Sequence, residues 1–576
     1  MLICGGGPVG LLLSYQLARM GIKTYAIEQH DKNTQAMYGR ACVLYPRTME
    51  MLDQLDLGET LGQIGFIGRS AVTYHNGKSI RGRGWGFISK PLDTFFDYCL
   101  NIRQKYSENV FRDAAKALGT SVHSNTKLIG FTVDDGQSDY KITAELQEEG
   151  GKAMRVRSKY IIGADGGHST VRSIADIPFQ GNKVEEEAVM HWIRMDALVK
   201  TNMPGARLGF GAIESPRHGN VLWIAEDHGR TRIGFALPTE VFEKHGEHMT
   251  EEVVKAEAMI ALAPFELEII TVDWWSLYSI GHRVANSFRT KERVFLAGDA
   301  GHTHSSGAAQ GMNTGMHDAV NLGWKISGVL KGWFTDSVLE TYSMERRAVA
   351  EQLIALDKTM STLISGKLPP GYGGDAHKVL GDVLESSAQF TIGLGVHYEA
   401  NTLNRDSSVS VVEPGWRGPD VLVHRPGSKI PMRLHQVTKN YGKFWIVVFA
   451  GSPFRTRSKL RALREYLDGP QSFTARLTDA FTFITVIAGP GLQADEVLGV
   501  ERFGDAFYDV DESAHVRYGI AADEGAVLIL RPDGTLGFAA GLHESAKLAE
   551  YLEAFITRKS EKWVELKMPE AGLRLN

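Results

Sequence analysis

The chain has 576 residues, of which 43% are hydrophobic and 23% charged, the proportions of a globular protein of two or three domains. These proportions exclude a mainly disordered chain, a collagen-like rod and a coiled coil. The formal charge of −5, from 63 basic and 68 acidic residues, offers no basic surface for nucleic acid, and no apolar run reaches the ~18 residues of a membrane span. We therefore expect neither a nucleic-acid partner nor a membrane span.

The three cysteines, Cys4, Cys42 and Cys99, have neither a CxxC nor a zinc-binding spacing. We expect a reducing compartment, the cytoplasm, because an odd number of cysteines does not make a disulfide framework. Residues 1–18 are apolar but lack the basic start and the cleavage site of a signal peptide. His302 and His304 form an H-x-H pair with no evident third ligand, so no metal is expected.

A dinucleotide-binding fingerprint opens the chain. Residues 1–4 predict a strand, residues 11–20 a helix, and a GxGxxG turn joins them. The glycines of this turn are Gly5, Gly7 and Gly10. The first permits a tight turn, the second lets the backbone approach a pyrophosphate, and the third lets helix and strand pack closely. Residues 24–27 predict the next strand, and Glu28 after it can accept hydrogen bonds from a ribose; a glycine-rich turn without a ligand is the alternative.

Two later strands end in acidic residues. The apolar run 160–164 leads into Asp165, and the run 293–298 leads into Asp299. Because ligands of open α/β sheets lie at the carboxyl edge of the strands, both acids are candidate ligand contacts. Residues 310–331 then predict a helix whose N-terminus favours an anionic group. A helix-capping role is the alternative for Asp299.

A second glycine motif, GPGLQA at residues 489–494, follows the apolar run 481–488. The segment after it is a poor helix because it contains Gly499 and Gly504. We interpret the motif as a strand followed by a turn, with a second nucleotide site as the alternative.

The combination of GxGxxG with Glu28, the DG motif at Asp165 and the GD motif at Asp299 resembles the FAD-dependent aromatic hydroxylases. The stretch RVFLAGDAGHTHSSGAAQGMNTGMHDAVNLGWK is similar to its equivalent in phenol hydroxylases (phenol 2-monooxygenases). The resemblance covers most of residues 1–350 and includes the segments YGRACVLYPRTMEML, LNIRQKYSE and LYSIGHRVA.

This resemblance implies an α/β protein of three domains. A Rossmann-type FAD-binding domain takes residues 1–180 and 273–365, and an inserted, mostly antiparallel substrate-binding sheet takes residues 181–272. Residues 188–199, 221–225 and 231–237 predict the strands of that sheet. We interpret Trp192 and Trp223 as core residues, with a place in the pocket wall as the alternative. A linker, residues 366–419, leads to a thioredoxin-like domain at 420–576 that helps to form a homodimer. In this last domain, the runs 444–450, 481–488, 526–530 and 535–539 predict strands, and residues 545–556 predict a closing helix.

The resemblance also implies how FAD is bound. The three glycines of the first motif and Glu28 contact the ADP half. The residues implied at the pyrophosphate and ribityl chain are Arg40, Arg103, Gln104 and Asp299. Those implied near the isoalloxazine ring and the nicotinamide surface are Asp165, Tyr278, Gly311, Met312 and Asn313.

The catalytic assignment is Tyr278 near the flavin and Arg232 as a donor to a substrate oxygen; a solvated arginine on the strand face stays open as the alternative. Phenol hydroxylases carry aspartate where this chain has Cys42, and a thiol is a poorer base than a carboxylate. A small buried residue is the alternative reading of this position. The loop proline of the family is replaced by Ser306.

The implied function is that of an FAD-dependent monooxygenase. It would use NAD(P)H and O2 to hydroxylate a small phenolic or related aromatic substrate through a flavin hydroperoxide. A flavoprotein dehydrogenase or oxidase without oxygen insertion is the alternative enzyme, and a noncatalytic nucleotide-binding protein is the alternative outside enzymes.

Overall fold

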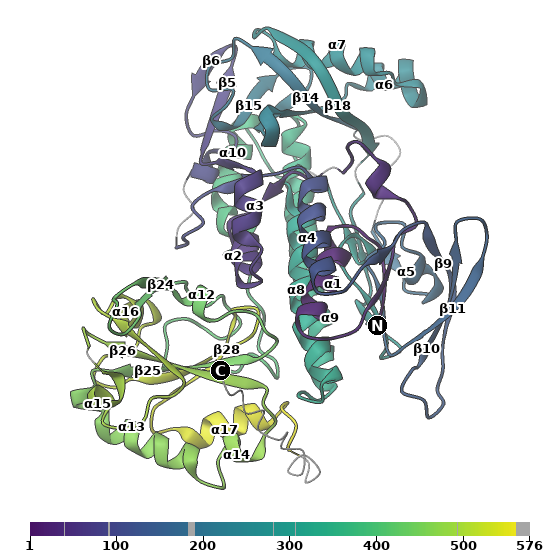
Figure 1. Cartoon of the computed structure of the whole chain (residues 1–576). Coiled ribbons are helices and arrows are strands. Elements are labelled where there is room, and N and C mark those ends of the chain that lie inside the picture. Colours follow the sequence, from purple (N-terminus) through teal and green to yellow (C-terminus); the bar gives the residue numbers. More distant parts are fainter. Residues whose placement is uncertain are drawn as a thin grey trace, which may run out of the picture. The chain divides into compact units, whose positions relative to one another are not determined.

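The computed structural model describes residues 1–39, 41–89, 93–181, 191–279, 281–305, 307–491 and 493–559. The chain divides into two compact units. The large unit comprises Met1–Trp324, Glu340–Tyr398 and His435–Tyr441. The C-terminal unit comprises Lys325–Leu339, Glu399–Leu434 and the described residues from Gly442 onward. Each unit contains sheets and helices of its own (Figure 1).

Six short strands form one sheet of the large unit, in the order β20-β21-β12-β1-β2-β8. They are β1 (Leu2–Cys4), β2 (Tyr25–Ile27), β8 (Val122–His123), β12 (Ile161–Gly163), β20 (Arg289–Thr290) and β21 (Val294–Leu296). All pair in parallel except β20. The central strands β1, β12 and β21 are entirely buried, as in parallel sheets that helices cover. This sheet confirms the expected Rossmann-type α/β architecture.

Helices α1 (Pro8–Arg19), α4 (Gln104–Ala117) and α8 (Gln310–Leu330) begin close to this sheet (Figure 1). Residues 10–17 of α1 are all buried, and Pro8 suits the first helical position because an N–H there has no partner within the helix. The side chain of Gln16 joins α1 to α8, since its Nε2 donates to the Val320 carbonyl at 3.2 Å. This hydrogen bond joins the C-terminal half of α1 to the middle of α8.

A second, seven-stranded sheet of the large unit has the order β18-β14-β17-β16-β15-β5-β6. Its strands are β5 (Ser70–His75), β6 (Lys78–Ile80), β14 (His191–Thr201), β15 (Gly209–Ser215), β16 (Gly219–Ala225), β17 (Thr231–Ala236) and β18 (Leu267–Ser279). All pairs are antiparallel except β5 with β15. The mostly antiparallel sheet is therefore confirmed, but it extends beyond residues 181–272 at both ends. The expected strand start at 188–190 lies outside the described residues.

Alternating side chains of this sheet enter two different cores, as the period of two in a strand requires. Ile193 and Trp223 pack with helix α7 (Glu251–Leu262) on one face, beside α6 (Thr239–His245). Trp192 and Leu222 pack on the other face. Both tryptophans are buried, so their assignment to the core is confirmed. Figure 1 shows α6 and α7 along one side of this sheet.

The remaining elements of the large unit are shorter or peripheral. The strands are β3 (Val43–Leu44), β4 (Phe66–Gly68), β7 (Cys99–Asn101), β9 (Thr126–Val133), β10 (Ile142–Glu148), β11 (Ala153–Ser158), β13 (Phe179–Gln180), β19 (Arg283–Ala285) and β22 (His302–Thr303). The helices are α2 (Pro46–Gln54), α3 (Gly58–Ile64), α5 (Thr170–Ile174), α10 (Ala376–Ser386) and α11 (Ala388–Thr391). Helix α9 (Ser337–Ile364) and the short α12 (Leu434–Val437) each contribute residues to both units.

Helices α10 and α11 fall in residues 366–419, where the sequence led us to expect a linker. Leu380 and Leu384 of α10 are buried against Leu363 of α9 in the core that also contains Trp192. The N-terminus of α10 is capped by Asp375, whose carboxylate accepts from the His377 N–H at 2.9 Å. This part of the expected linker is therefore packed structure, because its leucines recur at helical spacing on one face.

The C-terminal unit is built on one sheet with the order β24-β23-β27-β26-β25-β28-β29. Its strands are β23 (Leu422–His424), β24 (Pro431–Arg433), β25 (Phe444–Gly451), β26 (Phe481–Ala488), β27 (Asp505–Asp509), β28 (Ala526–Leu530) and β29 (Leu536–Gly541). Its helices are α13 (Pro453–Asp468), α14 (Phe473–Arg476), α15 (Ala494–Leu498), α16 (Ser513–Tyr518) and α17 (Ser545–Glu553). Parallel β25 and β26 flank α13 in the chain, and an antiparallel hairpin and α17 follow. This is the order expected of a thioredoxin-like α/β domain.

The GPGLQA motif lies in this C-terminal unit, directly after β26. The helix after it, α15, has only five residues. A Cβ atom on Gly491 would lie 1.6 Å from the Tyr508 ring, so this glycine makes room for an aromatic side chain. The geometry supports the interpretation as a strand and turn.

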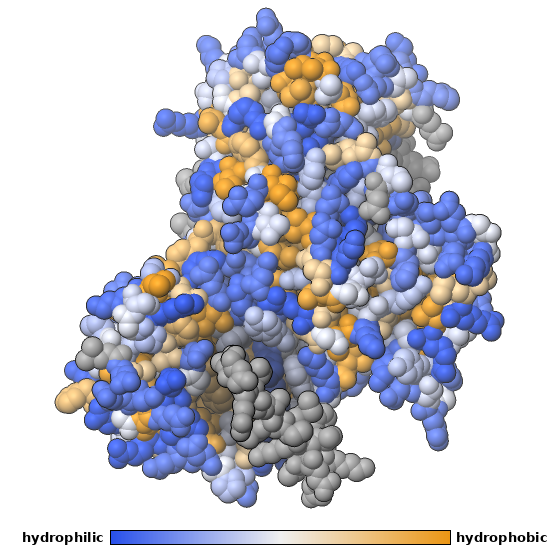
Figure 2. Space-filling view, viewed as in Figure 1, coloured by the Kyte–Doolittle hydropathy of each residue, from blue (hydrophilic) through white to orange (hydrophobic). Residues whose placement is uncertain are grey.

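No helix in the described part of the chain is long and apolar enough to cross a membrane. On the face shown in Figure 2, hydrophobic side chains form scattered patches between hydrophilic ones.

Candidate functional site

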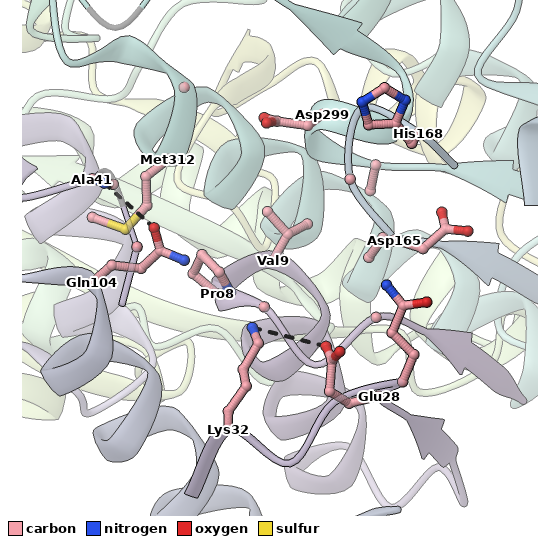
Figure 3. Close-up of a pocket in the computed structure, with 18 of the residues that line it drawn as sticks. Pro8, Val9, Glu28, Lys32, Ala41, Gln104, Asp165, His168, Asp299 and Met312 are labelled. Atoms are coloured by element: carbon pink, nitrogen blue, oxygen red, sulfur yellow. Dashed lines mark hydrogen bonds and ion pairs between the residues drawn. The ribbon is translucent and has the colours of Figure 1, made fainter. Parts of the chain in front are cut away.

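A cavity of about 810 Å³ opens in the large unit where several strands of the parallel sheet end. Glu28 follows β2, Asp165 follows β12, and Asp299 follows β21, and all three line this cavity. Figure 3 shows them around the turn that carries Pro8 and Val9. Three acids that are up to 271 positions apart in the numbering thus surround one space, as the carboxyl edge of a parallel sheet requires.

The glycine turn lets the backbone approach itself very closely. Gly5 has a φ of +113°, and a Cβ atom there would lie 2.1 Å from the Ala164 carbonyl oxygen. A Cβ atom on Gly10 would lie 2.0 Å from the Gly5 carbonyl oxygen. Helix α1 has no side-chain cap and no acid in its first turn. Its N-terminal N–H groups and positive dipole end are therefore suited to an anion such as a pyrophosphate.

The Glu28 carboxylate is held in place at the end of β2. Its Oε2 accepts from the Gly6 N–H at 2.8 Å and its Oε1 from the His30 N–H at 3.1 Å. Lys32 Nζ lies 3.8 Å from Oε2 (Figure 3). It also pairs with Glu108 at 3.4 Å. Lys32 lines the cavity as well, and it places a positive charge beside the glycine turn.

Only one oxygen of the Asp165 carboxylate accepts hydrogen bonds from the described residues. Its Oδ2 accepts from the N–H groups of Thr170 at 2.8 Å and Val171 at 3.1 Å, at the start of α5. Its Oδ1 is buried and has no hydrogen-bond partner among the described residues. Burial raises the pKa of Asp165. A carboxyl group with a free buried oxygen on the cavity wall is suited to a donor group of a ligand.

Gln104 and Met312 lie together at another part of the cavity wall (Figure 3). Gln104 opens α4, accepts from the Ala41 N–H at 3.3 Å and donates to Glu108 at 2.8 Å. Met312 and Gly311 belong to the first turn of α8 and line the cavity, so a second helix N-terminus faces it.

Several expected cofactor contacts lie outside the cavity lining. Arg103 is buried, and its guanidinium pairs with Asp227 and Asp273, each at 2.7 Å. Asn313 ties α8 to the neighbouring chain, since its Oδ1 accepts from the Tyr45 N–H at 2.9 Å and its Nδ2 donates to the Val43 carbonyl at 2.9 Å.

The other expected residues take different positions. Gly10 packs beneath the turn, and the Tyr278 hydroxyl accepts from Arg194 Nε at 3.0 Å. Arg40 and Ser306 lie outside the described residues.

Arg232 is buried, at 1% exposure, and lines the cavity. Its Nε and Nη2 atoms donate to the two Asp196 oxygens at 2.6 and 2.7 Å. The alternative of a solvated arginine on the strand face is therefore wrong, because this face of β17 packs toward the cavity rather than toward water.

Cys42 is buried beside Arg232 on the cavity wall, which agrees with a small buried residue. Burial raises the pKa of the Cys42 thiol well above its usual value, so the thiol keeps its proton at neutral pH.

The polar lining side chains that the sequence did not indicate include Lys32, His168 and Arg194, and His304 was considered only as a metal ligand. Lys32 could have been found from its position four residues after Glu28. Within the H-x-H pair, His304 Nδ1 lies 2.8 Å from the Ser305 carbonyl oxygen and so carries the proton. Burial lowers the pKa of His304, and its Nε2 has no hydrogen-bond partner in the described structure. The His304 ring therefore offers an acceptor at the wall.

The described residues contain no group of three or more histidine, cysteine or acidic side chains that could hold a metal ion. His302 instead contacts Asp318, with its Nε2 atom 2.8 Å from the carboxylate.

These features together fit a dinucleotide with an extended polyol chain. Two helix N-termini are available for negative charge, and Glu28 and Asp299 are available for hydroxyl groups. Asp165 Oδ1 and His304 Nε2 are buried polar atoms whose partners are missing from the described protein itself. A ligand at this wall would supply them.

Comparisons with known proteins agree with this geometry. The family described as "FAD binding domain" matches residues 1–357, and the family described as "Phenol hydroxylase, C-terminal dimerisation domain" matches residues 396–496 and 500–560. The chain is 28% identical to 3-hydroxybenzoate 4-monooxygenase from Comamonas testosteroni, over 96% of this chain and 94% of that protein. It is 25% identical to phenol 2-monooxygenase fsqG from Aspergillus fumigatus, over 96% and 95%.

A solved structure has the same fold. OxyS anhydrotetracycline hydroxylase from Streptomyces rimosus superposes with a TM-score of 0.70 at 23% identity, covering 97% of this chain and 99% of that one.

We predict that Gly10→Ala removes most of the bound FAD. The added Cβ atom would lie 2.0 Å from the Gly5 carbonyl oxygen and would force the turn away from α1. The measurement is the flavin absorbance of the purified protein relative to its protein absorbance. Gly62→Ala is the matched control, because a Cβ atom at that position in α3 meets nothing within 4 Å. Equal flavin content in both variants would contradict the prediction.

We also predict that Asp299→Ala weakens FAD binding by about 10-fold to 100-fold, the effect of losing a hydrogen bond to a charged group. Asp299 lies at the end of β21 on the cavity wall, where it can accept from a hydroxyl of the polyol chain. The dissociation constant is measured by fluorescence titration of the apoprotein with FAD. Asp135→Ala, at an exposed acid, serves as the control. Unchanged FAD affinity in Asp299→Ala would rule out this contact.

Proposed function

The chain belongs to the family described as "FAD binding domain", which matches residues 1–357, and from this membership and its monooxygenase relatives we propose its reaction. It is an FAD-dependent monooxygenase that hydroxylates a phenolic or related aromatic compound with an oxygen atom from O2. The named relatives 3-hydroxybenzoate 4-monooxygenase and phenol 2-monooxygenase support this substrate class.

One observation carries the proposal: a single cavity has a dinucleotide side and an apolar side. The dinucleotide side consists of the glycine turn and the acids at the strand ends. The apolar side is lined by Cys42, Leu222, Ile224 and Trp274, together with Arg194 and Arg232. An aromatic ring fits apolar and aromatic walls, while the arginines can donate to its oxygen substituents. A redox cofactor and an aromatic substrate can therefore meet in one space.

FAD, when bound, supplies the oxidation–reduction chemistry and the activation of O2. The protein supplies position and electrostatics. The N-termini of α1 and α8 bind negative charge, and Asp299 orients the polyol chain. Leu222, Ile224 and Trp274 keep water away from the reacting ring. Arg232 stabilises negative charge on a substrate oxygen, whereas Cys42 keeps its proton and does not act as the base.

We propose NAD(P)H as the reductant. The chain has one glycine fingerprint in strand–turn–helix context, and the second glycine motif leads only into the five-residue α15. NAD(P)H therefore approaches the same cavity, near Asp165, without a nucleotide-binding domain of its own.

We propose that the protein is a homodimer formed through the C-terminal unit. The match of this region to a dimerisation domain supports the proposal, as do large apolar side chains that are exposed in it. Phe454 is 92% exposed and Val516 is 74% exposed.

The three cysteines are all free and buried, which supports a reducing compartment, the cytoplasm.

The function is tested with a panel of phenols and hydroxybenzoates. We expect at least one to stimulate NAD(P)H oxidation and to yield a product that contains one atom of labelled oxygen from ¹⁸O2, detected by mass spectrometry. Oxidised product without the label would instead establish a dehydrogenase or oxidase. A purified protein without flavin absorbance, even after incubation with FAD, would overturn the enzyme assignment.

For the dimer, we expect light scattering to give twice the chain mass. Phe454→Glu weakens the dimer by roughly 10-fold to 100-fold, the loss from no longer burying a phenylalanine. Met344→Glu is the control, since Met344 is 60% exposed but lies in the large unit. A monomeric wild-type protein would contradict the proposed homodimer, and equal effects of both variants would contradict the assignment of the interface to the C-terminal unit.

A further inference from the structure

A buried carboxyl group lies behind the substrate side of the cavity. Glu226 directly follows β16, has 0% exposure, and has no hydrogen-bond partner for either carboxyl oxygen within the described residues. The Nε atom of Arg232 lies 3.4 Å from Oε1 of Glu226. A buried carboxyl group in this state is rare and requires a physical explanation.

Arg232 already has a better partner. Its Nε and Nη2 atoms form two parallel hydrogen bonds with Asp196, at 2.6 and 2.7 Å. Asp196 is also buried, at 1% exposure. Two buried carboxyl groups thus adjoin one guanidinium, and its favoured geometry belongs to Asp196. Ionisation of Glu226 would therefore add a second negative charge beside a pair that is already balanced.

The other charged groups that the structure describes around Glu226 form their hydrogen bonds and ion pairs with other atoms. Asp227 follows it in the chain and pairs with Arg103 at 2.7 Å, and Arg103 pairs with Asp273 as well. Arg207 donates to the backbone carbonyl of Glu226 at 3.1 Å, and the Cys42 thiol near Arg232 is neutral. Burial, followed by the nearby Asp196 carboxylate, raises the pKa of Glu226 to about 8. At neutral pH Glu226 holds a proton.

We propose that Glu226 is a positioning residue that sets, through Arg232, whether the cavity accepts a substrate as its phenolate. With a proton on Glu226, this carboxyl group adds no negative charge beside the Arg232–Asp196 pair, and the guanidinium can stabilise an anionic oxygen at the wall that it lines. Without that proton, the additional negative charge behind Arg232 repels the phenolate. The phenolic substrate class rests on the proposed function, while the effect on a bound phenolate does not require turnover.

The proton balance of this step is simple. When the phenol ionises, its O–H bond breaks, the electron pair stays on the oxygen, and the proton leaves to solvent. The phenolate oxygen then accepts hydrogen bonds from Arg232. Nothing is oxidised or reduced, and Glu226 keeps its proton throughout. Conversely, phenolate binding to protein with ionised Glu226 draws one proton from solvent onto Glu226.

The test uses the FAD-loaded protein without NAD(P)H and measures the binding of 4-nitrophenolate by difference absorbance across about pH 7 to pH 9.5. Because Glu226 ionises as the pH rises through its pKa of about 8, we expect the affinity of the wild-type protein for nitrophenolate to fall about tenfold over this range. Glu226→Gln is neutral at every pH and keeps its high affinity. Glu214→Gln, at another buried acid of the same sheet, retains the wild-type fall.

A second measurement does not depend on any variant. Calorimetry of nitrophenolate binding to the wild-type protein near pH 8.5, in two buffers with different ionisation enthalpies, is expected to show proton uptake. A pH-independent affinity, a fall that persists in Glu226→Gln, binding without proton uptake, or no nitrophenolate binding at pH 7 would each overturn the proposal. A nitrophenolate response as expected, together with no labelled product from any phenol, would overturn only the proposed function.

Discussion

The cavity depends on backbone atoms that approach one another more closely than any side chain permits. Gly5 lies against the Ala164 carbonyl and Gly10 against the Gly5 carbonyl, so that β1, α1 and the segment after β12 share one contact point. This contact brings the uncapped start of α1 and the Asp165 carboxyl group to the same wall. Every other part of the dinucleotide side is placed relative to this point, because β2 and β21 extend the same sheet.

The apolar side of the cavity is formed by side chains of a sheet rather than by close backbone contacts. There, a mostly antiparallel sheet presents alternate residues to the cavity, so that Leu222 and Ile224 of β16 and Arg232 of β17 share one wall. Arg232 is tolerated in this apolar setting because Asp196 pairs with it across neighbouring strands. Among the described residues, no side chain forms a hydrogen bond with the Glu226 carboxyl group, whose raised pKa keeps a proton on it at neutral pH. A dinucleotide side built on backbone contacts and a wall with a buried ion pair thus meet in one cavity.

The dinucleotide side could be predicted from the sequence because its signals are local. A strand, a glycine turn, a helix and a terminal acid follow one another within 28 residues. The burial of Arg232 could not be predicted, since it depends on the pairing of β17 with β14 and β16, which only the tertiary fold defines. For the same reason, strands β5 and β6 could not be predicted. The short β5 is stabilised by pairing with β15, which lies more than 100 residues later in the chain. Arg103 lies next to Gln104 in the sequence, yet only Gln104 lines the cavity, because the guanidinium is held by Asp227 and Asp273.

The pairing of β5 with β15 also bears on how this protein can be recombined with its relatives. Six residues of β5, from Ser70 to His75, pair with β15, although the other main strands of that sheet all lie beyond residue 190. In a chimaera that exchanged only the strands beyond residue 190, β15 would come from the relative and β5 from this protein. These two strands would then have to pair although they did not evolve together. Crossover points for transplanting the substrate side therefore come in two pairs, one flanking β5 and β6 and one flanking β14 to β18.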